Sequence, residues 1–325
     1  MVLCITHSQD QYTIDIVQQH LKKLGIDSFR FNSDQFATAY HFNYSLHGCI
    51  NDLCWSANNT TLYASQITGV WYRKLWKLQV PEELDPDYTF IFEKEYKTHL
   101  HIFFEALYSL PWINKIDSDH AAGGNKFHQL MVAKHCGLTI PKTILTNSQA
   151  AVLDFYEVCK GNIVMKLHGA LSKSMKRDGA FFPTTFLSQH DLPQLDTLPY
   201  CPMIFQEQIT KLYELRIVYI DGAFYTGKIN TQHTQKGKID WRTTTTRIAP
   251  WEPYVLPTTV EEKIDSMMRQ MDLSFGAIDM IKQPNGEYTF LEVNPQGEWG
   301  MLQRDLGYPI GETIAEKLIK RIKNG

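Results

Sequence analysis

The feature that most constrains the fold is the segment FGAIDMIKQPNGEYTFLEVN, residues 275–294, in which two apolar runs flank an Asn-Gly pair. An Asn-Gly pair between runs of this kind predicts a β-hairpin with a tight turn. If Asn285 and Gly286 form the whole loop, Pro284 pairs with Glu287, and the pairing of every residue further out follows by counting. The chain is therefore predicted to contain an antiparallel pair of buried strands with a defined register.

Counting outward from that turn places Asp279 directly opposite Glu292, and Asn294 shares the face because side chains two apart in a strand point the same way. Two facing carboxylates repel one another across a sheet. A divalent cation removes the repulsion, and oxygen ligands of this type suit magnesium, which commonly keeps positions for phosphate oxygens. The alternative is a solvent-exposed hairpin face with hydrated charges. The apolar flanks FGAI and TFL favour burial, and hence a magnesium and nucleotide site.

The length of 325 residues exceeds the ~250–300 at which single cores stop growing, so we expect more than one domain. The runs VLCITHS, YTIDIVQQHLKKLG and DSFRFN read as strand, helix and strand, which predicts a doubly wound α/β start. Periodicity is lost around PWINKIDSDHAAGGNKF, and this marks a boundary near residue 118. We predict an N-terminal α/β domain at 1–118, a central subdomain at 119–205, and a C-terminal subdomain with the metal site at 206–325.

Composition excludes several classes of protein. A net charge of −3 gives no overall attraction to nucleic acid or to an acidic membrane surface. The N-terminus lacks the basic leader and cleavage site of a signal peptide, and no apolar run reaches the ~20 residues of a membrane span. The six cysteines include no C-x-x-C pair, which favours reduced thiols and a cytoplasmic location over disulfides or structural zinc.

A nucleotide also needs cations, and the sequence places two lysines where phosphate binding would explain them. Lys166 interrupts the strand GNIVMKLHG, although an edge-strand lysine that extends to solvent is the alternative. Lys126 begins a predicted helix, whose N-terminus favours anions, although helix-surface lysines are common. Ser172 lies in the small, basic segment ALSKSMKRDG, which could close over phosphates, as many polar loops could.

In chain order these features resemble the ATP-grasp fold from about residue 110 to the C-terminus, and the βαβ start is similar to its N-terminal domain. The ordered features are a helix lysine, a strand lysine with a small-residue loop, a FQEQI segment, a strand arginine and a final Asp with LEVN. More narrowly, the chain resembles the microviridin-type ligases, the graspetide macrocyclases, in nearly its whole length. The motifs that carry this resemblance are VWYRK, NKFHQLMVA, GLTIPKT, FQEQI, ELRI, GAIDMI and FLEVNPQGEW.

The resemblance implies roles for individual residues. Lys126 and Lys166 would hold the nucleotide phosphates, and Glu207 through Ile209 would present backbone groups to adenine. Glu214 would contact the ribose. The remaining implied roles are Arg216 at the γ-phosphate and acyl phosphate, and Asp279, Glu292 and Asn294 at magnesium.

A second hairpin limits the choice of catalytic cation. Asp221 and Gly222 predict a type I′ turn, which places Arg216 opposite Gly227 and turns Lys228 to the other face. Only one of the two faces can meet ATP unless a bulge intervenes. We choose the face of Arg216, which the resemblance implies, and Asn230 on the other face is the alternative.

The resemblance also implies contacts with a precursor peptide. Its leader would dock at FLSQHDLPQLD through Asp191, for which a solvated helix start is an equal alternative. Arg73 in VWYRK, and Arg242 and Arg247 in DWRTTTTR, would guide an acidic core peptide, although each could be an ordinary surface charge.

The expected activity is an ATP-dependent ligation that phosphorylates Asp or Glu side chains of a ribosomally made precursor and joins them to Ser or Thr hydroxyls as ω-esters. ω-Amide formation with Lys, an intermolecular peptide or glutamate ligase, and a nucleotide-regulated peptide-binding module remain alternatives. We expect ATP and Mg²⁺ as cofactors, a homodimer, and no binding to nucleic acid or membrane.

Overall fold

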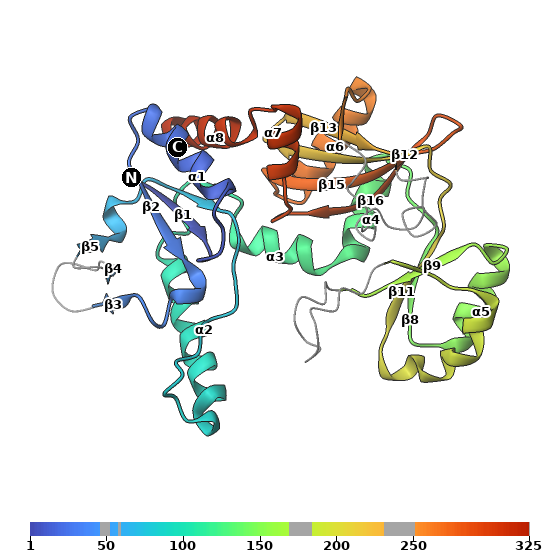
Figure 1. Ribbon diagram of the computed structural model, residues 1–325, viewed down its shortest axis with the longest axis horizontal. Coiled ribbons are helices and arrows are strands. Elements are labelled where there is room, and N and C mark those ends of the chain that lie inside the picture. Colours follow the sequence, from blue (N-terminus) through green and yellow to red (C-terminus); the bar gives the residue numbers. More distant parts are fainter. Residues whose placement is uncertain (46–52, 58–59, 169–183, 231–250, 325) are drawn as a thin grey trace. The chain divides into compact units, whose positions relative to one another are not determined.

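The computed structural model describes residues 1–45, 53–57, 60–168, 184–230 and 251–324 (Figure 1). They form two compact units. The first unit comprises Met1–Asp117, Leu273–Phe275 and Tyr308–Gly325, and the second comprises Ser118–Asp272 and Gly276–Gly307. No helix in these ranges is long and apolar enough to cross a membrane.

A parallel sheet of order β2-β1-β6-β7 forms the centre of the first unit. Its strands are β1 (Val2–Thr6), β2 (Ser28–Asn32), β6 (Gly69–Tyr72) and β7 (Trp112–Ile113). Helix α1 (Thr13–Lys23) connects β1 to β2, and the two strands pair in parallel with Val2 opposite Ser28. The βαβ start predicted from the sequence is confirmed.

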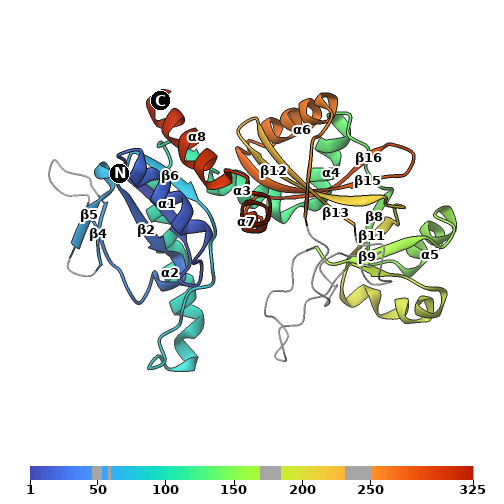
Figure 2. The ribbon, with the colours of Figure 1, turned by 45° about the horizontal axis from the view of Figure 1, so that its top comes forward.

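Helices cover both faces of this sheet (Figure 2). Helix α2 (Thr89–Glu105) packs Phe103 against the face that carries Leu3 and Ile5. On the other face α1 packs against α8 (Ile310–Asn324), which also contacts β6 and β7. The last helix of the chain thus belongs to the first unit, whereas the three-part division from the sequence extends the third domain to residue 325. That division remains a prediction.

A small antiparallel sheet of order β3-β4-β5 completes the first unit. The strands are β3 (His41–Tyr44), β4 (Leu53–Ala57) and β5 (Thr60–Tyr63). Trp55 is buried there and meets Phe103 edge to face at a ring distance of 5.1 Å, so one aromatic core joins this sheet to α2.

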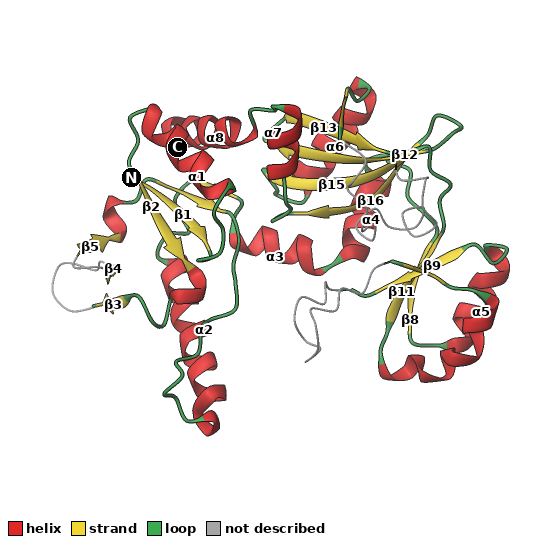
Figure 3. Ribbon diagram, viewed as in Figure 1, coloured by secondary structure: helices red, strands yellow, loops and turns green. Residues whose placement is uncertain are grey.

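The second unit holds an antiparallel sheet of order β10-β9-β11-β8 (Figure 3). Its strands are β8 (Thr143–Thr146), β9 (Ile163–Lys166), β10 (Thr185–Phe186) and β11 (Met203–Glu207). Helix α5 (Gln149–Val158) and the 3₁₀ helix η4 (Gln189–Tyr200) pack on one face through a core that includes Phe155, Leu195 and Phe205. The other face carries Lys166, because it pairs with Ile204 and not with Phe205.

The same unit holds a sheet of order β14-β13-β12-β15-β16. The strands are β12 (Tyr213–Ile220), β13 (Ala223–Ile229), β14 (Glu252–Tyr254), β15 (Phe275–Lys282) and β16 (Tyr288–Asn294). The helices are α3 (Ile116–Gly124), α4 (Lys126–His135), α6 (Thr258–Gln270) and α7 (Gly300–Leu306). Helix α6 lies on one face, where Tyr219 Oη donates to Asp265 Oδ1 at 2.7 Å, and α7 packs over Gly227 on the other.

The predicted type I′ turn between β12 and β13 is confirmed. Asp221 and Gly222 have φ values of 47° and 85°, and Ile220 pairs with Ala223 directly beside them. Arg216 consequently pairs with Gly227, as the count from the sequence requires. The face that carries Arg216 is opposite to the one covered by α6.

The five cysteines in the described ranges, Cys4, Cys54, Cys136, Cys159 and Cys201, are free thiols, and Cys49 lies outside those ranges. Burial raises the pKa of Cys4 to about 12. A thiol with so high a pKa is a poor nucleophile, so Cys4 acts as a small core residue.

Candidate functional site

The hairpin β15–β16 brings the predicted metal ligands together, but its loop differs from the predicted one. The pair Gln283 and Glu287 closes the hairpin, because the Gln283 amide donates to the Glu287 carbonyl at 2.9 Å. The Gly286 amide donates to the Gln283 carbonyl at 3.1 Å, and Gly286 has a φ of 96°. This is a three-residue loop, a turn followed by a left-handed glycine. The predicted two-residue loop, with Pro284 paired to Glu287, is wrong.

A β-bulge restores the register that the longer loop would shift. Lys282 pairs with Tyr288 and Met280 with Phe290, yet Asp279 pairs with Glu292. Leu291 is therefore an extra residue on β16. Without it, Asp279 would face Leu291, and Glu292 would point to the face covered by α6. The predicted opposition of Asp279 and Glu292 is confirmed. The loop is one residue longer than predicted, and the extra residue of the bulge on β16 compensates for it.

The three predicted metal ligands gather on the face that carries Arg216. Asn294 Nδ2 lies 3.5 Å from Asp279 Oδ2 and 3.4 Å from Glu292 Oε1. Glu292 is only 9% exposed, so its carboxylate is not a solvated surface charge. Small Ala277 pairs with Asn294, which limits crowding beside the amide.

Two cations hold the two carboxylates. Lys126 Nζ lies 2.7 Å from Glu292 Oε2, and Arg216 Nη1 donates to Asp279 Oδ1 at 2.9 Å. Lys126 is the first residue of α4, and the side chain of Asn125 caps this helix by accepting from the His128 amide at 3.0 Å. The predicted phosphate lysine and the predicted catalytic arginine thus meet the predicted metal ligands in one cluster.

The cluster fits a hydrated magnesium ion and a phosphate. Its donors are two carboxylates and one carboxamide, the oxygen ligands that Mg²⁺ prefers. No group of three or more His, Cys, Asp and Glu side chains in the described ranges offers an alternative metal site. Nε of Arg216 is buried without a hydrogen-bond partner in those ranges. A buried donor of this kind favours a further anionic ligand at the guanidinium.

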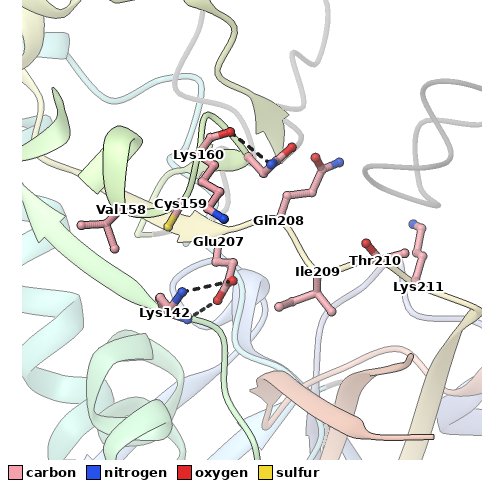
Figure 4. A pocket seen from close by; sticks show the side chains of 10 residues that line it. Lys142, Val158, Cys159, Lys160, Glu207, Gln208, Ile209, Thr210 and Lys211 are labelled. Carbon is pink, nitrogen blue, oxygen red and sulfur yellow. Dashed lines mark hydrogen bonds and ion pairs between the residues drawn. The ribbon is translucent and has the colours of Figure 1, made fainter. Parts of the chain in front are cut away.

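A cavity of about 660 Å³ lies at the segment that links β11 to β12 (Figure 4). Its size is within the range of roughly 300–1,000 Å³ typical of small-molecule sites. The lining residues are Lys142, Val158, Cys159, Lys160, Asn162, Glu207, Gln208, Ile209, Thr210 and Lys211. Glu207 and Ile209, the predicted adenine contacts, therefore both line this cavity.

Within this cavity the Glu207 side chain points to the α5 face of the small sheet. It follows Phe205 by two residues, and Phe205 belongs to the core under α5. Burial raises the pKa of the Cys159 thiol at the end of α5, and the Glu207 carboxylate raises it further. Lys142 Nζ lies 3.5 Å from Glu207 Oε1, and Figure 4 shows the two side chains converging.

Two backbone amides of the segment that links β11 to β12 already donate hydrogen bonds within the protein. The Glu207 amide donates to the Lys142 carbonyl at 2.9 Å, and the Gln208 amide donates to the Asn162 carbonyl at 2.8 Å. No backbone hydrogen bond involves the Ile209 amide in the part of the chain that is described. If the predicted adenine site is here, the backbone groups that remain for it are the Ile209 amide and carbonyl groups.

Two further predicted nucleotide residues, Glu214 and Lys166, lie on strands of the two different sheets of this unit. Glu214 at the start of β12 forms an ion pair with Lys211, and both side chains are largely buried. Lys166 at the end of β9 is half-buried on the face away from α5. Ser172, Arg242 and Arg247 lie outside the described residues.

Two predicted peptide contacts have structural partners. Arg73, which follows β6 in the first unit, is 3% exposed, and its Nε donates to Thr13 Oγ1 at 3.2 Å and lies 3.8 Å from Asp10 Oδ2. Asp191 Oδ2 accepts from the amide and hydroxyl of Ser188 at 2.8 and 2.6 Å, which caps η4. These hydrogen bonds hold the pKa of Asp191 below its usual value. Their roles as peptide contacts remain predictions.

Sequence reasoning missed Lys142, Lys211 and Gln129. The first two neutralise Glu207 and Glu214, and the i to i+3 spacing of Lys211 and Glu214 was the only local signal. Gln129 lies three residues after Lys126 on α4 and is 1% exposed. The signal in the sequence that could have found Gln129 is a polar residue on the side of this short helix that faces the core.

The fold and the site define a class of protein. The second unit has two sheets, with a cavity at the segment that links them, and a doubly wound unit precedes it in the chain. At one of these sheets two cations lie beside a cluster of two carboxylates and a carboxamide. An ATP-grasp ligase, which is an ATP-dependent enzyme, has this arrangement.

Comparison with known proteins shows which family of such ligases this is. Residues 1–120 match the family model of the MvdD pre-ATP grasp domain. The chain is 31% identical to macrocyclase MdnC from Microcystis aeruginosa MRC, solved with precursor peptide MdnA, with a TM-score of 0.87 over 98% of this chain and 99% of that one. It is 34% identical to macrocyclase MdnB from the same organism, with a TM-score of 0.83 and 98% of each chain covered. The protein belongs to the microviridin-type ATP-grasp macrocyclase family.

A further similar structure is a RiPP-associated ATP-grasp ligase from Chryseobacterium gregarium, solved in complex with ADP and a leader and core peptide. It is 28% identical, with a TM-score of 0.92 over 98% of this chain and 96% of that one. A comparison with curated protein sequences gave no match.

Proposed function

We propose that this enzyme joins Asp or Glu side chains of a ribosomally made precursor peptide to Ser or Thr hydroxyls as ω-esters, using ATP. The observation that carries this proposal is the cluster in which Lys126 meets Glu292 and Arg216 meets Asp279, beside Asn294. It stands in a chain of which 98% aligns with macrocyclases, one of them solved with a precursor peptide.

The nucleotide would lie between the cavity and the cluster. Adenine would contact the Ile209 amide and neighbouring carbonyls, and Glu214 would contact the ribose. Lys126, Lys166 and Ser172 would hold the phosphates. Asp279, Glu292 and Asn294 would hold magnesium, which when bound neutralises charge on the phosphate oxygens. ADP in the Chryseobacterium ligase supports a nucleotide in this family.

The reaction has two steps. A carboxylate oxygen of the peptide attacks the γ-phosphorus of ATP, so that an acyl phosphate forms and ADP leaves. A hydroxyl of the same peptide then attacks the acyl carbon, loses its proton and displaces phosphate. Arg216 stabilises the negative charge that develops on the transferred group, and its buried guanidinium needs little reorganisation to do so.

The precursor would supply two binding regions. Its leader would dock at the η4 region near Asp191, and its acidic core would meet Arg73, Arg242 and Arg247. The complexes of MdnC with MdnA and of the Chryseobacterium ligase with leader and core peptides support a peptide partner. We expect the enzyme to act as a homodimer in the cytoplasm, which light scattering and localisation of a tagged chain would test.

The decisive experiment is incubation with ATP, Mg²⁺ and the precursor encoded beside the gene, followed by mass spectrometry. Each ring removes one water from the peptide, whereas an intermolecular ligase would add mass. Mild alkali opens esters and leaves amides intact, so the same products separate ω-ester from ω-amide rings. A precursor that keeps or gains mass would overturn the macrocyclase proposal, and alkali-resistant rings would replace ester by amide.

A further inference from the structure

Gln129 on α4 is a buried side-chain amide that bonds to backbone on two elements. Its Nε2 donates to the Ala122 carbonyl at 2.7 Å and to the Val293 carbonyl at 2.9 Å. Its Oε1 accepts from the Val293 amide at 2.9 Å. One side chain thus satisfies both backbone groups of Val293 and links α3, α4 and β16. With 1% of its surface exposed, Gln129 makes these bonds away from water.

The hydrogen bonds to Val293 matter because of where this residue lies in the strand. Val293 stands between Glu292 and Asn294, two of the three proposed metal ligands. Strand β16 is also the edge of its sheet, so a neighbouring strand supports it on one side only. On the outer side the Phe290 amide donates to the Thr139 carbonyl at 2.8 Å, and Gln129 continues this support at Val293. The side-chain amide therefore acts as a substitute for a paired strand.

The same helix also carries the lysine that meets the site. Lys126 and Gln129 are three apart on α4 and share one side of the helix. Lys126 Nζ lies 2.7 Å from Glu292, and Gln129 holds the next residue of the strand. Neutral hydrogen bonds of Gln129 thus link α4 to β16 in addition to the ion pair of the lysine.

We propose that Gln129 is a positioning residue of the metal site. It holds β16 against α4 so that Glu292 and Asn294 keep the spacing that magnesium requires. Residues that orient metal ligands commonly change metal affinity by about 10–100-fold when they are replaced. The inference rests on the proposed magnesium and nucleotide site. It adds to that site a residue that would touch neither the magnesium nor the nucleotide.

The test replaces Gln129 by methionine, which keeps the length of the side chain and removes all three hydrogen bonds. ADP binding is measured by calorimetry over a series of Mg²⁺ concentrations. We expect the Mg²⁺ concentration at half-maximal binding to rise about tenfold in Q129M, with ADP affinity in the absence of metal unchanged. Amide exchange in residues 288–294 of the ligand-free protein should become faster. An unchanged Mg²⁺ midpoint would overturn the proposal.

Asn114 provides a matched control. Its buried amide also bonds to strand backbone, accepting from the Ser274 and Phe275 amides at 2.8 Å and donating to the Phe275 carbonyl at 2.9 Å. The N114L variant should lose comparable thermal stability and keep the wild-type Mg²⁺ midpoint. If N114L shifts the midpoint as much as Q129M, a general loss of stability explains the effect and the proposal fails.

Two further variants complete the design. If Q129M does not fold, Q129E is used instead. This variant keeps the side-chain volume and the acceptor for the Val293 amide, but it replaces the donor to the Ala122 and Val293 carbonyl groups by an oxygen. It should also raise the Mg²⁺ midpoint, and an unchanged midpoint would overturn the inference. Wild-type protein whose ADP binding is independent of Mg²⁺, or an E292A variant with the wild-type midpoint, would remove the proposed metal site itself. That failure is distinguishable because Gln129 is intact in both proteins.

Discussion

Each cation at the candidate site neutralises one carboxylate. Lys126 and Arg216 lie 2.7 and 2.9 Å from Glu292 and Asp279. A partly buried carboxylate without a partner is costly, so these ion pairs stabilise the site. A bound phosphate would draw both cations away, and a bound metal would take over the carboxylates. We therefore expect nucleotide and Mg²⁺ to increase each other's affinity.

Glu292→Ala tests the metal assignment at the level of a single residue. We expect loss of ATP-dependent dehydration of the precursor, because the variant lacks one proposed ligand, while circular dichroism shows a folded protein. The matched control is Glu287→Ala, at an exposed position in the pair that closes the hairpin, which should form rings at the wild-type rate. Full ring formation by the Glu292 variant would contradict the assignment.

Arg216→Met tests stabilisation of the transferred phosphoryl group. Loss of one well-placed donor commonly lowers a rate by about 10²–10³-fold, and we expect a decrease of this size in ADP release with precursor present. Lys228→Met is the control, because Lys228 pairs with Leu215 and forms an ion pair with Glu252 on the other face. Equal losses in the two variants would argue against a specific role for Arg216.

Asp191→Ala tests whether that carboxylate serves the fold. A lowered pKa in the native state means that the ionised cap contributes stability above the unfolded pKa, and that this contribution is lost as the pH falls through the folded value. We expect the variant to be less stable at pH 7 by about 1 kcal/mol, and the difference to vanish in acid. Asp196→Ala, at an exposed position of η4, is the matched control and should change the stability at pH 7 little. A stable variant that no longer binds precursor would instead assign Asp191 to the leader.

At the scale of elements, the hairpins show which parts of the fold follow from the sequence. Asp221 and Gly222 dictate a type I′ turn, so the position of Arg216 could be counted correctly. The sequence pattern specifies neither the three-residue loop at Gly286 nor the bulge at Leu291, because an Asn-Gly pair fits a two-residue loop as well. The opposition of Asp279 and Glu292 was predicted because the two differences cancel. Gln129 could not be assigned, since its partner is 164 residues away.

Packing of α7 on β13 requires a glycine. A Cβ at Gly227 would lie 2.6 Å from Leu302 Cδ2 and 3.0 Å from Trp251 Cε3, and both side chains are buried. We expect Gly227→Ala to destabilise the protein by about 1–3 kcal/mol in thermal unfolding, because α7 must shift from the sheet. Gly124→Ala has nothing within 4 Å of the new Cβ and should be neutral or slightly stabilising. Equal stability of both variants would show that α7 adapts freely.

For the whole molecule, the path of the chain matters as much as its motifs. Helix α8 comes from the C-terminus yet packs with α1 in the first unit, where Ile322 lies over Gly69. Truncation after Gly307 should therefore unfold the first unit, which circular dichroism and limited proteolysis of Met1–Asp117 would detect. Replacing Lys323, at an exposed position near the end of α8, by alanine should have little effect. A truncated protein with an intact first unit would contradict the packing argument.

The covered outer edge of β16 also has a consequence for solubility. An edge strand with open N–H and C=O groups is a template on which another chain can pair. Here Thr139 and Gln129 occupy those groups, and the strand contains the aggregation-prone run Tyr-Thr-Phe-Leu. Variants that detach α4 would thus form β-rich aggregates as well as lose metal affinity. The amide that is proposed to order the metal site would thus also block pairing of this edge with another chain.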